Sequence, residues 1–168
     1  MRQKTKQLTR AALIAALYIA LSYLQDFLLP GSASMAIQFR VSEALCVFAL
    51  FTPSAIWGLT VGCMLFNLSG AGLLPLDFLI GAGATFLATG AMWLTRKWTI
   101  KGFPLLALLM PAVFNALIIG GELAFVIGGG FFLNAAYVAI GEVAVLLTLG
   151  SFLFYILKLR SLEKHLFE

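Results

Sequence analysis

Apolar runs separated by helix-breaking residues divide the chain into six segments. They run from Leu8 to Leu29, Phe39 to Phe51, Ser54 to Leu68, Pro75 to Lys97, Phe103 to Ile127 and Phe131 to Leu159. The breaks between them hold proline, glycine and serine, which interrupt helices. Most segments reach about the twenty residues that an α-helix needs to cross the hydrocarbon core of a bilayer. The pattern predicts an all-α membrane protein, a compact bundle of six transmembrane helices forming one domain over residues 1–168.

The second and third segments are short for independent spans. Phe39 to Phe51 and Ser54 to Leu68 meet at Thr52-Pro53. A tilted or re-entrant arrangement would accommodate them. Alternatively, the two segments fuse into one broken span, which would give five helices rather than six.

Composition supports a membrane environment. The chain is 62% hydrophobic and 11% charged, and its mean hydropathy is +1.03. A soluble domain is about half apolar and about a quarter charged. So small a protein cannot hide this much apolar surface in its own core, so lipid must solvate much of it.

The basic residues form three short clusters beside apolar runs. With six spans, all but Arg40 of the 11 Lys and Arg residues lie on one side. Because cytoplasmic loops carry an excess of Lys and Arg, that side is the cytoplasm, and both termini lie there. A five-span arrangement would put the cluster of Arg96, Lys97 and Lys101 outside, against this rule. The distribution of basic residues therefore favours six spans. The net charge of +4 is therefore a topology signal and not a nucleic-acid patch.

Polar side chains inside the apolar segments are the candidate site. A carboxylate in mid-bilayer costs about 2.5–3.5 kcal/mol on insertion scales and indicates function by default. Six spans bring most of these polar groups toward the outer surface, with Glu142 nearer the midplane. Their convergence predicts a small-molecule site there. The candidates are Asp26, Arg40, Glu43, Asn67, Asp77, Asn115, Glu122, Asn134, Tyr137 and Glu142.

Several candidates have a structural alternative. Asp26 and Asp77 could lie at the water interface, and Asp77 could also stabilise the N-terminus of its own helix. Arg40 and Glu43, three positions apart, could form a structural pair. Asn115 could bond a neighbouring helix. The acids hardest to explain structurally are Glu122 and Glu142, because no Lys or Arg inside the membrane remains to neutralise them.

Small residues mark one helix as a packing surface. Ala11, Ala12, Ala15 and Ala16, with Ala20, give small-xxx-small spacings on the first segment. Such a surface lets another helix approach closely. That helix could belong to a partner protein or to this chain.

The sequence lacks the residues of several catalytic classes. It contains no phosphate-binding loop with the GxxxxGK[ST] spacing, so it is not an ATPase by itself. One histidine, His165, and two separated cysteines, Cys46 and Cys63, do not predict a metal site. No catalytic set is evident, so the chain is predicted to be neither an enzyme nor a cofactor protein.

Three groups of motifs resemble the QueT family. They are Gln38-Phe39-Arg40-Val41-Ser42-Glu43-Ala44; Gly62-Cys63 with Asn67 and then Asp77, Gly81 and Thr85; and Asn115-Ala116, Gly120, Glu122, Asn134-Ala135, Tyr137, Gly141 and Glu142. The resemblance covers nearly the whole chain, and Arg-x-Ser-Glu-Ala is its most specific part.

The resemblance implies a substrate-binding S component of an energy-coupling-factor (ECF) importer in the bacterial cell membrane. It implies a partner module of two cytoplasmic ATPases, which use the ATP, and a transmembrane coupling protein that the first-helix alanines face. The implied substrate is a queuosine precursor, a 7-deazaguanine base or its salvage form. The alternatives are an S component for another vitamin-like substrate and an ion- or proton-coupled transporter with Glu142 as proton carrier.

The polar candidates suit the recognition of such a base. A deazaguanine presents two adjacent N–H donors, and a carboxylate such as Glu43 or Glu122 can accept from both. Asn67, Asn115 or Asn134 could donate to its carbonyl.

Other side chains could contact the ring face of the base and its aminomethyl arm. Phe39, Phe125 or Tyr137 could stack on the base. A cationic aminomethyl arm could pair with Asp77 or Glu142.

Overall fold

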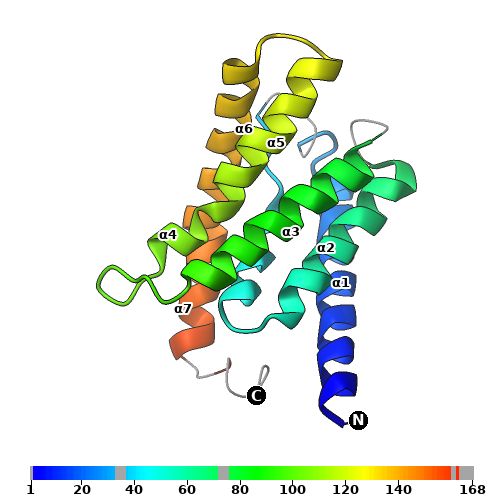
Figure 1. Cartoon of the computed structure of the whole chain (residues 1–168). Coiled ribbons are helices and arrows are strands. Elements are labelled where there is room, and N and C mark those ends of the chain that lie inside the picture. Colours follow the sequence, from blue (N-terminus) through cyan, green and yellow to red (C-terminus); the bar gives the residue numbers. More distant parts are fainter. Residues whose placement is uncertain (1, 33–36, 72–75, 160–161, 163–168) are drawn as a thin grey trace.

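The computed structural model describes residues 2–32, 37–71, 76–159 and 162, and the regular elements of this part of the chain are all helices, beside one isolated β-bridge between Ile100 and Phe103. Six helical passes follow one another in alternating directions, as the sequence predicted (Figure 1). They are α1 (Arg2–Leu28); the 3₁₀ helix η1 (Val41–Leu50); α2 (Ser54–Phe66) with the π-helical turn η2 (Asn67–Ala71); α3 (Asp77–Thr95); α4 (Leu105–Leu108) with α5 (Met110–Val126); and α6 (Phe131–Val145) with the π-helical turn η3 (Leu146–Gly150) and α7 (Ser151–Leu159). The predicted start of the fourth helix at Pro75 lies outside the described residues.

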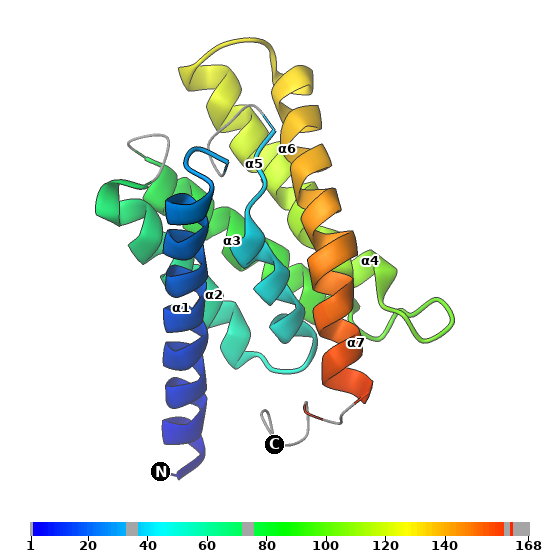
Figure 2. The ribbon, with the colours of Figure 1, turned by 180° about the vertical axis from the view of Figure 1, so that it is seen from behind.

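Four of the passes are long and apolar enough to cross a membrane. They are Gln3–Leu28, Asp77–Thr95, Leu105–Val126 and Phe131–Leu159. The shorter apolar helices are Val41–Leu50 and Ser54–Ser69, the two segments whose length left a five-helix alternative. A turn at Phe51–Pro53 separates them, and they run antiparallel (Figure 2). They are therefore two passes and not one broken span.

The short η1 lies at the centre of the bundle. It packs against α1, α2, α3, α4, α6, η3 and α7, and eight of its ten side chains are buried. A helix enclosed by protein does not have to match the thickness of the hydrocarbon. Its 3₁₀ form rises about 2 Å per residue, so ten residues span about 20 Å where an α-helix would span about 15 Å.

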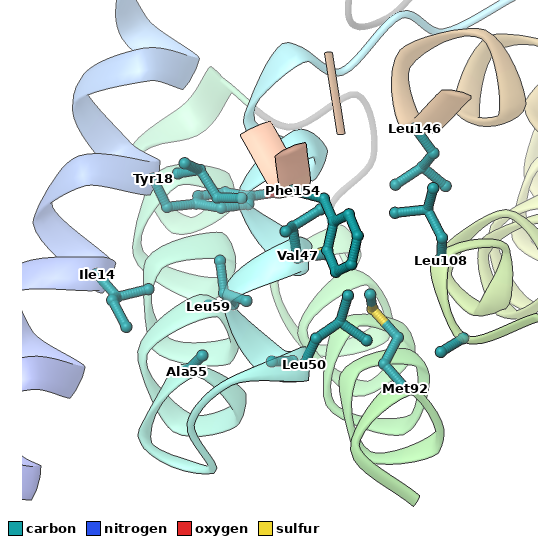
Figure 3. Packing of buried hydrophobic residues seen from close by; sticks show 14 of the residues in the cluster. Ile14, Tyr18, Val47, Leu50, Ala55, Leu59, Met92, Leu108, Leu146 and Phe154 are labelled. Carbon is teal, nitrogen blue, oxygen red and sulfur yellow. The ribbon is translucent and has the colours of Figure 1, made fainter. Parts of the chain in front are cut away.

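A hydrophobic core surrounds the lower half of η1 (Figure 3). Val47 and Leu50 of η1 meet Tyr18 of α1 and Leu59 of α2 on one side. The other side is closed by α3, α4, η3 and α7, through Met92, Leu108, Leu146 and Phe154. A smaller cluster of Ala84, Ile119, Leu123 and Val138 joins α3, α5 and α6. Six helical elements, α1, α2, α3, α4, η3 and α7, thus hold η1 in place through apolar side chains.

Two glycines let α2 approach α1 closely. A Cβ atom on Gly58 would lie 2.6 Å from the backbone oxygen of Ala11, and one on Gly62 would lie 3.0 Å from that of Ala15. Ala11 and Ala15 therefore lie toward α2, and Ala15 is buried. The neighbouring face of α1, with Ala12, Ala16 and Ala20, is exposed. The small-residue pattern thus serves internal packing on one face and leaves the other open.

Gly58→Ala is expected to lower the free energy of unfolding by about 1–3 kcal/mol, since the helices must separate to admit the methyl group. Gly83→Ala is the matched control, because a Cβ at Gly83 meets nothing within 4 Å. It should be neutral or stabilising by up to about 1 kcal/mol, the difference in helix propensity. Thermal unfolding of the purified protein in detergent measures both. Equal effects of the two substitutions would contradict close α1–α2 packing.

Candidate functional site

An ion pair joins two passes at the end of the bundle away from the start of α1. Arg40 stands immediately before η1, and Asp77 begins α3. The Nη2 atom of Arg40 lies 3.6 Å from Oδ2 of Asp77, and the two side chains are only 12% and 3% exposed. Asp77 is therefore buried rather than at the water interface. Removing one partner of such a pair would leave an uncompensated charge, which is strongly destabilising.

Arg40 does not pair with Glu43 through their side chains, although the two are three positions apart. The i, i+3 rule applies within a helix, whereas Arg40 has an extended backbone (φ −94°, ψ 93°) and precedes η1. Its backbone oxygen instead accepts a hydrogen bond from the Glu43 backbone N–H at 3.0 Å. The extended residue thus directs its guanidinium toward α3.

Asn67 ties the end of α2 to the start of α3. It occupies the first position of η2, and its Nδ2 donates to the backbone oxygen of Asp77 at 3.1 Å. A Cβ on Gly81, one turn into α3, would lie 2.9 Å from the Nδ2 atom of Asn67 and 3.0 Å from Oδ1 of Asp77. Asn67, Asp77 and Gly81 are therefore packed tightly against one another, a contact that the sequence analysis did not predict.

Glu122 is a buried carboxylate without a hydrogen-bond partner among the described residues. It lies on α5 and is 7% exposed, and neither of its oxygens receives a donor. It is close enough to Asp77 and Arg40 for their charges to interact. Buried polar groups are nearly always hydrogen-bonded, and an exception calls for an explanation such as a ligand or water. Glu122 therefore has both oxygens available to accept from a bound molecule, and so has Asp77, whose two oxygens also lack a hydrogen-bond donor among the described residues.

Glu142 and Asn115 form a second, deeper pair. Nδ2 of Asn115 on α5 donates to Oε1 of Glu142 on α6 at 2.8 Å, while Oε2 of Glu142 has no partner among the described residues. The bond links two helices, as the structural alternative for Asn115 anticipated. Glu142 also lies close enough to Glu43 and Arg40 for their charges to interact. This pair therefore borders the same polar region.

Glu43 is held by two donors inside the bundle. The hydroxyl of Tyr18 donates to Oε1 at 2.9 Å, and the thiol of Cys46 donates to Oε2 at 3.1 Å. The Tyr18 bond fastens α1 to η1. Sequence reasoning overlooked Tyr18, although a tyrosine in an apolar helix needs a partner for its hydroxyl group.

A second overlooked residue, Gln25, holds the segment that enters η1. Its Nε2 donates to the Ser32 hydroxyl at 2.9 Å and to the backbone oxygen of Phe39. Its Oε1 accepts from the backbone N–H of Val41 at 2.7 Å. One side chain of α1 thus fixes the backbone on both sides of Arg40. A glutamine inside a membrane-crossing helix was the signal that could have revealed it.

Among the described residues, the side chains of the remaining candidates have no recorded hydrogen bond or ion pair with this region. Asn134 donates to the backbone oxygen of Gly128 at 2.8 Å and so closes the α5–α6 turn. Asp26 is exposed, which fits the interfacial alternative. Phe125 is 92% exposed and Phe39 is 43% exposed, whereas Tyr137 is half-buried.

The region holds more carboxyl groups than basic groups. Among the residues that the structure describes, Arg40 is the one basic side chain there, whereas Glu43, Asp77, Glu122 and Glu142 are all buried carboxylates. The other described Lys and Arg side chains lie on the first turns of α1, after α3 and at the end of α7 (Figures 1 and 2). A region with an excess of carboxyl groups favours ligands that bring hydrogen-bond donors or positive charge.

Gln25→Leu is expected to expose the amide of Val41 to solvent exchange. The substitution removes the only acceptor that the structure records for the Val41 N–H, and it also removes the two bonds from Gln25 to Ser32 and Phe39. Hydrogen–deuterium exchange of peptides covering residues 37–45 measures this, with an expected rise in exchange rate of at least about tenfold. Ser32→Ala is the control, since it removes one bond and leaves Val41 paired. Unchanged exchange in Gln25→Leu would show that the hydrogen bonds of Gln25 do not hold this segment.

These features define an integral membrane protein with a buried, acid-rich polar region reached by all the passes. Comparison with known proteins identifies the family: the model described as "QueT transporter" matches residues 8–159, and the chain belongs to the QueT family. The "Queuosine precursor transporter QueT" of Lactococcus lactis subsp. cremoris (strain MG1363) is 31% identical over 163 residues, which cover 90% of this chain and 92% of that protein. No solved structure matches the chain.

Proposed function

We propose that this chain binds a queuosine precursor, a 7-deazaguanine-type base, and acts as the S component of an ECF importer. Membership of the QueT family and the name of the Lactococcus relative support the substrate class. The size of the chain supports the role of a binding subunit, since independent secondary transporters are commonly built from internal repeats and the sequence shows none.

The observation that carries this proposal is the unpaired carboxylate of Glu122 beside the Arg40–Asp77 ion pair. A deazaguanine carries adjacent N–H donors on one edge and a carbonyl oxygen next to them. Glu122 supplies the acceptors for the donors. The guanidinium of Arg40 supplies a donor for the carbonyl oxygen, because Arg carries five N–H groups and its 3.6 Å ion pair with Asp77 involves no recorded hydrogen bond.

The other polar groups take supporting roles in this proposal. The free Oε2 of Glu142 can pair with a cationic aminomethyl arm. Glu43, whose charge interacts with that of Glu142, already accepts one bond on each oxygen. Each oxygen keeps a lone pair that can accept a further bond. Asn67 and Asn115 orient Asp77 and Glu142, and the half-buried Tyr137 is the candidate for stacking on the base. Asn134 contributes indirectly, because it holds the turn between α5 and α6 through its bond to Gly128.

The orientation follows from charge. We place the end that carries the basic residues in the cytoplasm, so the acid-rich region opens toward the outside. Substrate capture then takes place on the side from which an importer must collect it.

The partner module supplies the energy. Within these 168 residues there is no phosphate-binding loop, so ATP-driven uptake needs separate ATPases, two of them in an ECF module, and a transmembrane coupling protein. We propose that the coupling protein docks on the exposed face of α1 formed by Ala12 and Ala16. Ala11 and Ala15 support that face by holding α1 against α2.

Glu122→Gln is expected to weaken binding of 7-aminomethyl-7-deazaguanine by about 10- to 100-fold, because a charged hydrogen bond contributes about 1.5–3 kcal/mol. Glu43→Gln should also weaken binding. Calorimetric titration of the purified chain gives both dissociation constants. Asp26→Asn, which removes an exposed carboxylate, should leave affinity unchanged. Normal affinity in both glutamine variants, with thermal midpoints near that of the parent protein, would refute this site.

Purified chain in proteoliposomes is expected to bind the base but not to accumulate it on an imposed proton gradient. Accumulation should require the coupling protein, the two ATPases and ATP. The control is the complete complex with an ATPase inactivated in its own nucleotide site. If the chain alone concentrates the base and Glu142→Gln abolishes this, the protein is a proton-coupled transporter and the S-component role is wrong.

A further inference from the structure

A pocket of about 370 Å³ lies at the basic end of the bundle, opposite the acid-rich region. It lies between the turn after α3 and the end of α7, which are neighbours in both views (Figures 1 and 2). Its lining residues are Lys101, Gly102, Phe103, Phe154, Tyr155, Lys158 and Leu159. Two lysines therefore share a pocket whose remaining side chains are apolar or aromatic.

The turn holds Lys101 in an unusual conformation. Ile100 and Phe103 exchange backbone hydrogen bonds of 2.9 and 3.0 Å, and the two residues between them have positive φ, 51° at Lys101 and 82° at Gly102. Positive φ at both central positions is typical of a tight turn in which Asn-Gly is preferred. A lysine there is disfavoured, and an outlier of this kind points to a role for the side chain.

The second lysine is held against an aromatic wall. Nζ of Lys158 lies 5.3 Å from the centre of the Phe154 ring and 3.5 Å from the backbone oxygen of Gly102. Phe103 stacks on Tyr155 at 5.7 Å between ring centres and meets Phe154 edge-on at 5.5 Å. The ammonium thus has donors left for an anion, and the rings beside it form a rigid apolar surface.

No carboxylate among the described residues neutralises these lysines. The described acids lie in the acid-rich region or, like Asp26, near the far end of α1. Leu159 in the pocket is 81% exposed, and Trp98 and Ile100, just before the pocket residue Lys101 in the chain, are 69% and 64% exposed. Exposed tryptophan beside lysine at the end of a membrane-crossing helix is typical of the headgroup level of a bilayer.

We propose that this pocket binds the headgroup of an anionic phospholipid. Lys101 and Lys158 pair with the phosphate, and an acyl chain lies along Tyr155 and Leu159. Basic pockets between helices at the cytoplasmic surface suit such lipids. A free phosphate ion would use the lysines but not the aromatic and aliphatic walls, so the apolar lining favours the lipid.

The test compares phosphatidylglycerol with phosphatidylcholine of identical acyl chains. The full chain is purified in detergent, and native mass spectrometry measures the ratio of the two bound lipids. The parent protein should prefer phosphatidylglycerol, and Lys101→Asn and Lys158→Gln should each reduce that preference roughly fivefold. Asn suits positive φ, so Lys101→Asn should fold at least as well as the parent, and Lys158→Gln tests the pocket independently of the turn.

Lys97→Gln is the matched control, because Lys97 is exposed in the same loop but does not line the pocket. It should leave the preference unchanged. The proposal is overturned if Lys97→Gln lowers the ratio as much as the pocket variants, or if the parent protein shows no preference. It is also overturned if inorganic phosphate alone raises the thermal midpoint as much as phosphatidylglycerol does and Lys101→Asn removes that effect, since the ligand would then be a free anion.

Discussion

The Arg40–Asp77 ion pair is the contact on which the polar half of the molecule depends. Lipid cannot satisfy polar groups, so charges that enter the membrane must be paired within the protein. Arg40 reaches Asp77 because Gln25 holds the backbone on either side of it, and Asp77 is positioned by Asn67. Four passes, those of α1, η1, α2 and α3, therefore converge on one contact. Glu122 and Glu142, from the remaining two long passes, lie around it.

The sequence predicted the passes well and their contacts less well. Periodic breaks and basic clusters were sufficient to find six helices, because hydrocarbon thickness fixes the length of lipid-facing helices. They could not show that η1 is a 3₁₀ helix at the centre, since that depends on enclosure by seven other elements. The acids Glu122 and Glu142 were recognised because an intramembrane carboxylate is costly. Tyr18 and Gln25 were missed because uncharged polar residues carry a weaker signal, and their importance comes from partners distant in sequence.

The two ends of the bundle are built for different neighbours. The acid-rich region has one arginine and buried carboxylates, with tight side-chain hydrogen bonds between passes. The opposite end has lysines and arginines without described acids, and a wall of stacked aromatic rings. The hydrophobic core around Val47 and Leu50 separates them. One end is suited to a polar small molecule and the other to the surface of an anionic bilayer.

The enclosure of η1 also affects how the protein responds to its membrane. Bilayers differ in thickness, and lipid-facing helices adjust by tilting or by thinning the lipid around them. Because η1 contacts protein on nearly every side, it is the surrounding helices that tilt or thin the lipid when the bilayer thickness changes. The buried side chains of η1, Glu43 among them, are thereby kept from direct contact with lipid. A change in bilayer thickness can reach Glu43 only through the helices that pack against it, such as α1, whose Tyr18 donates to its carboxylate.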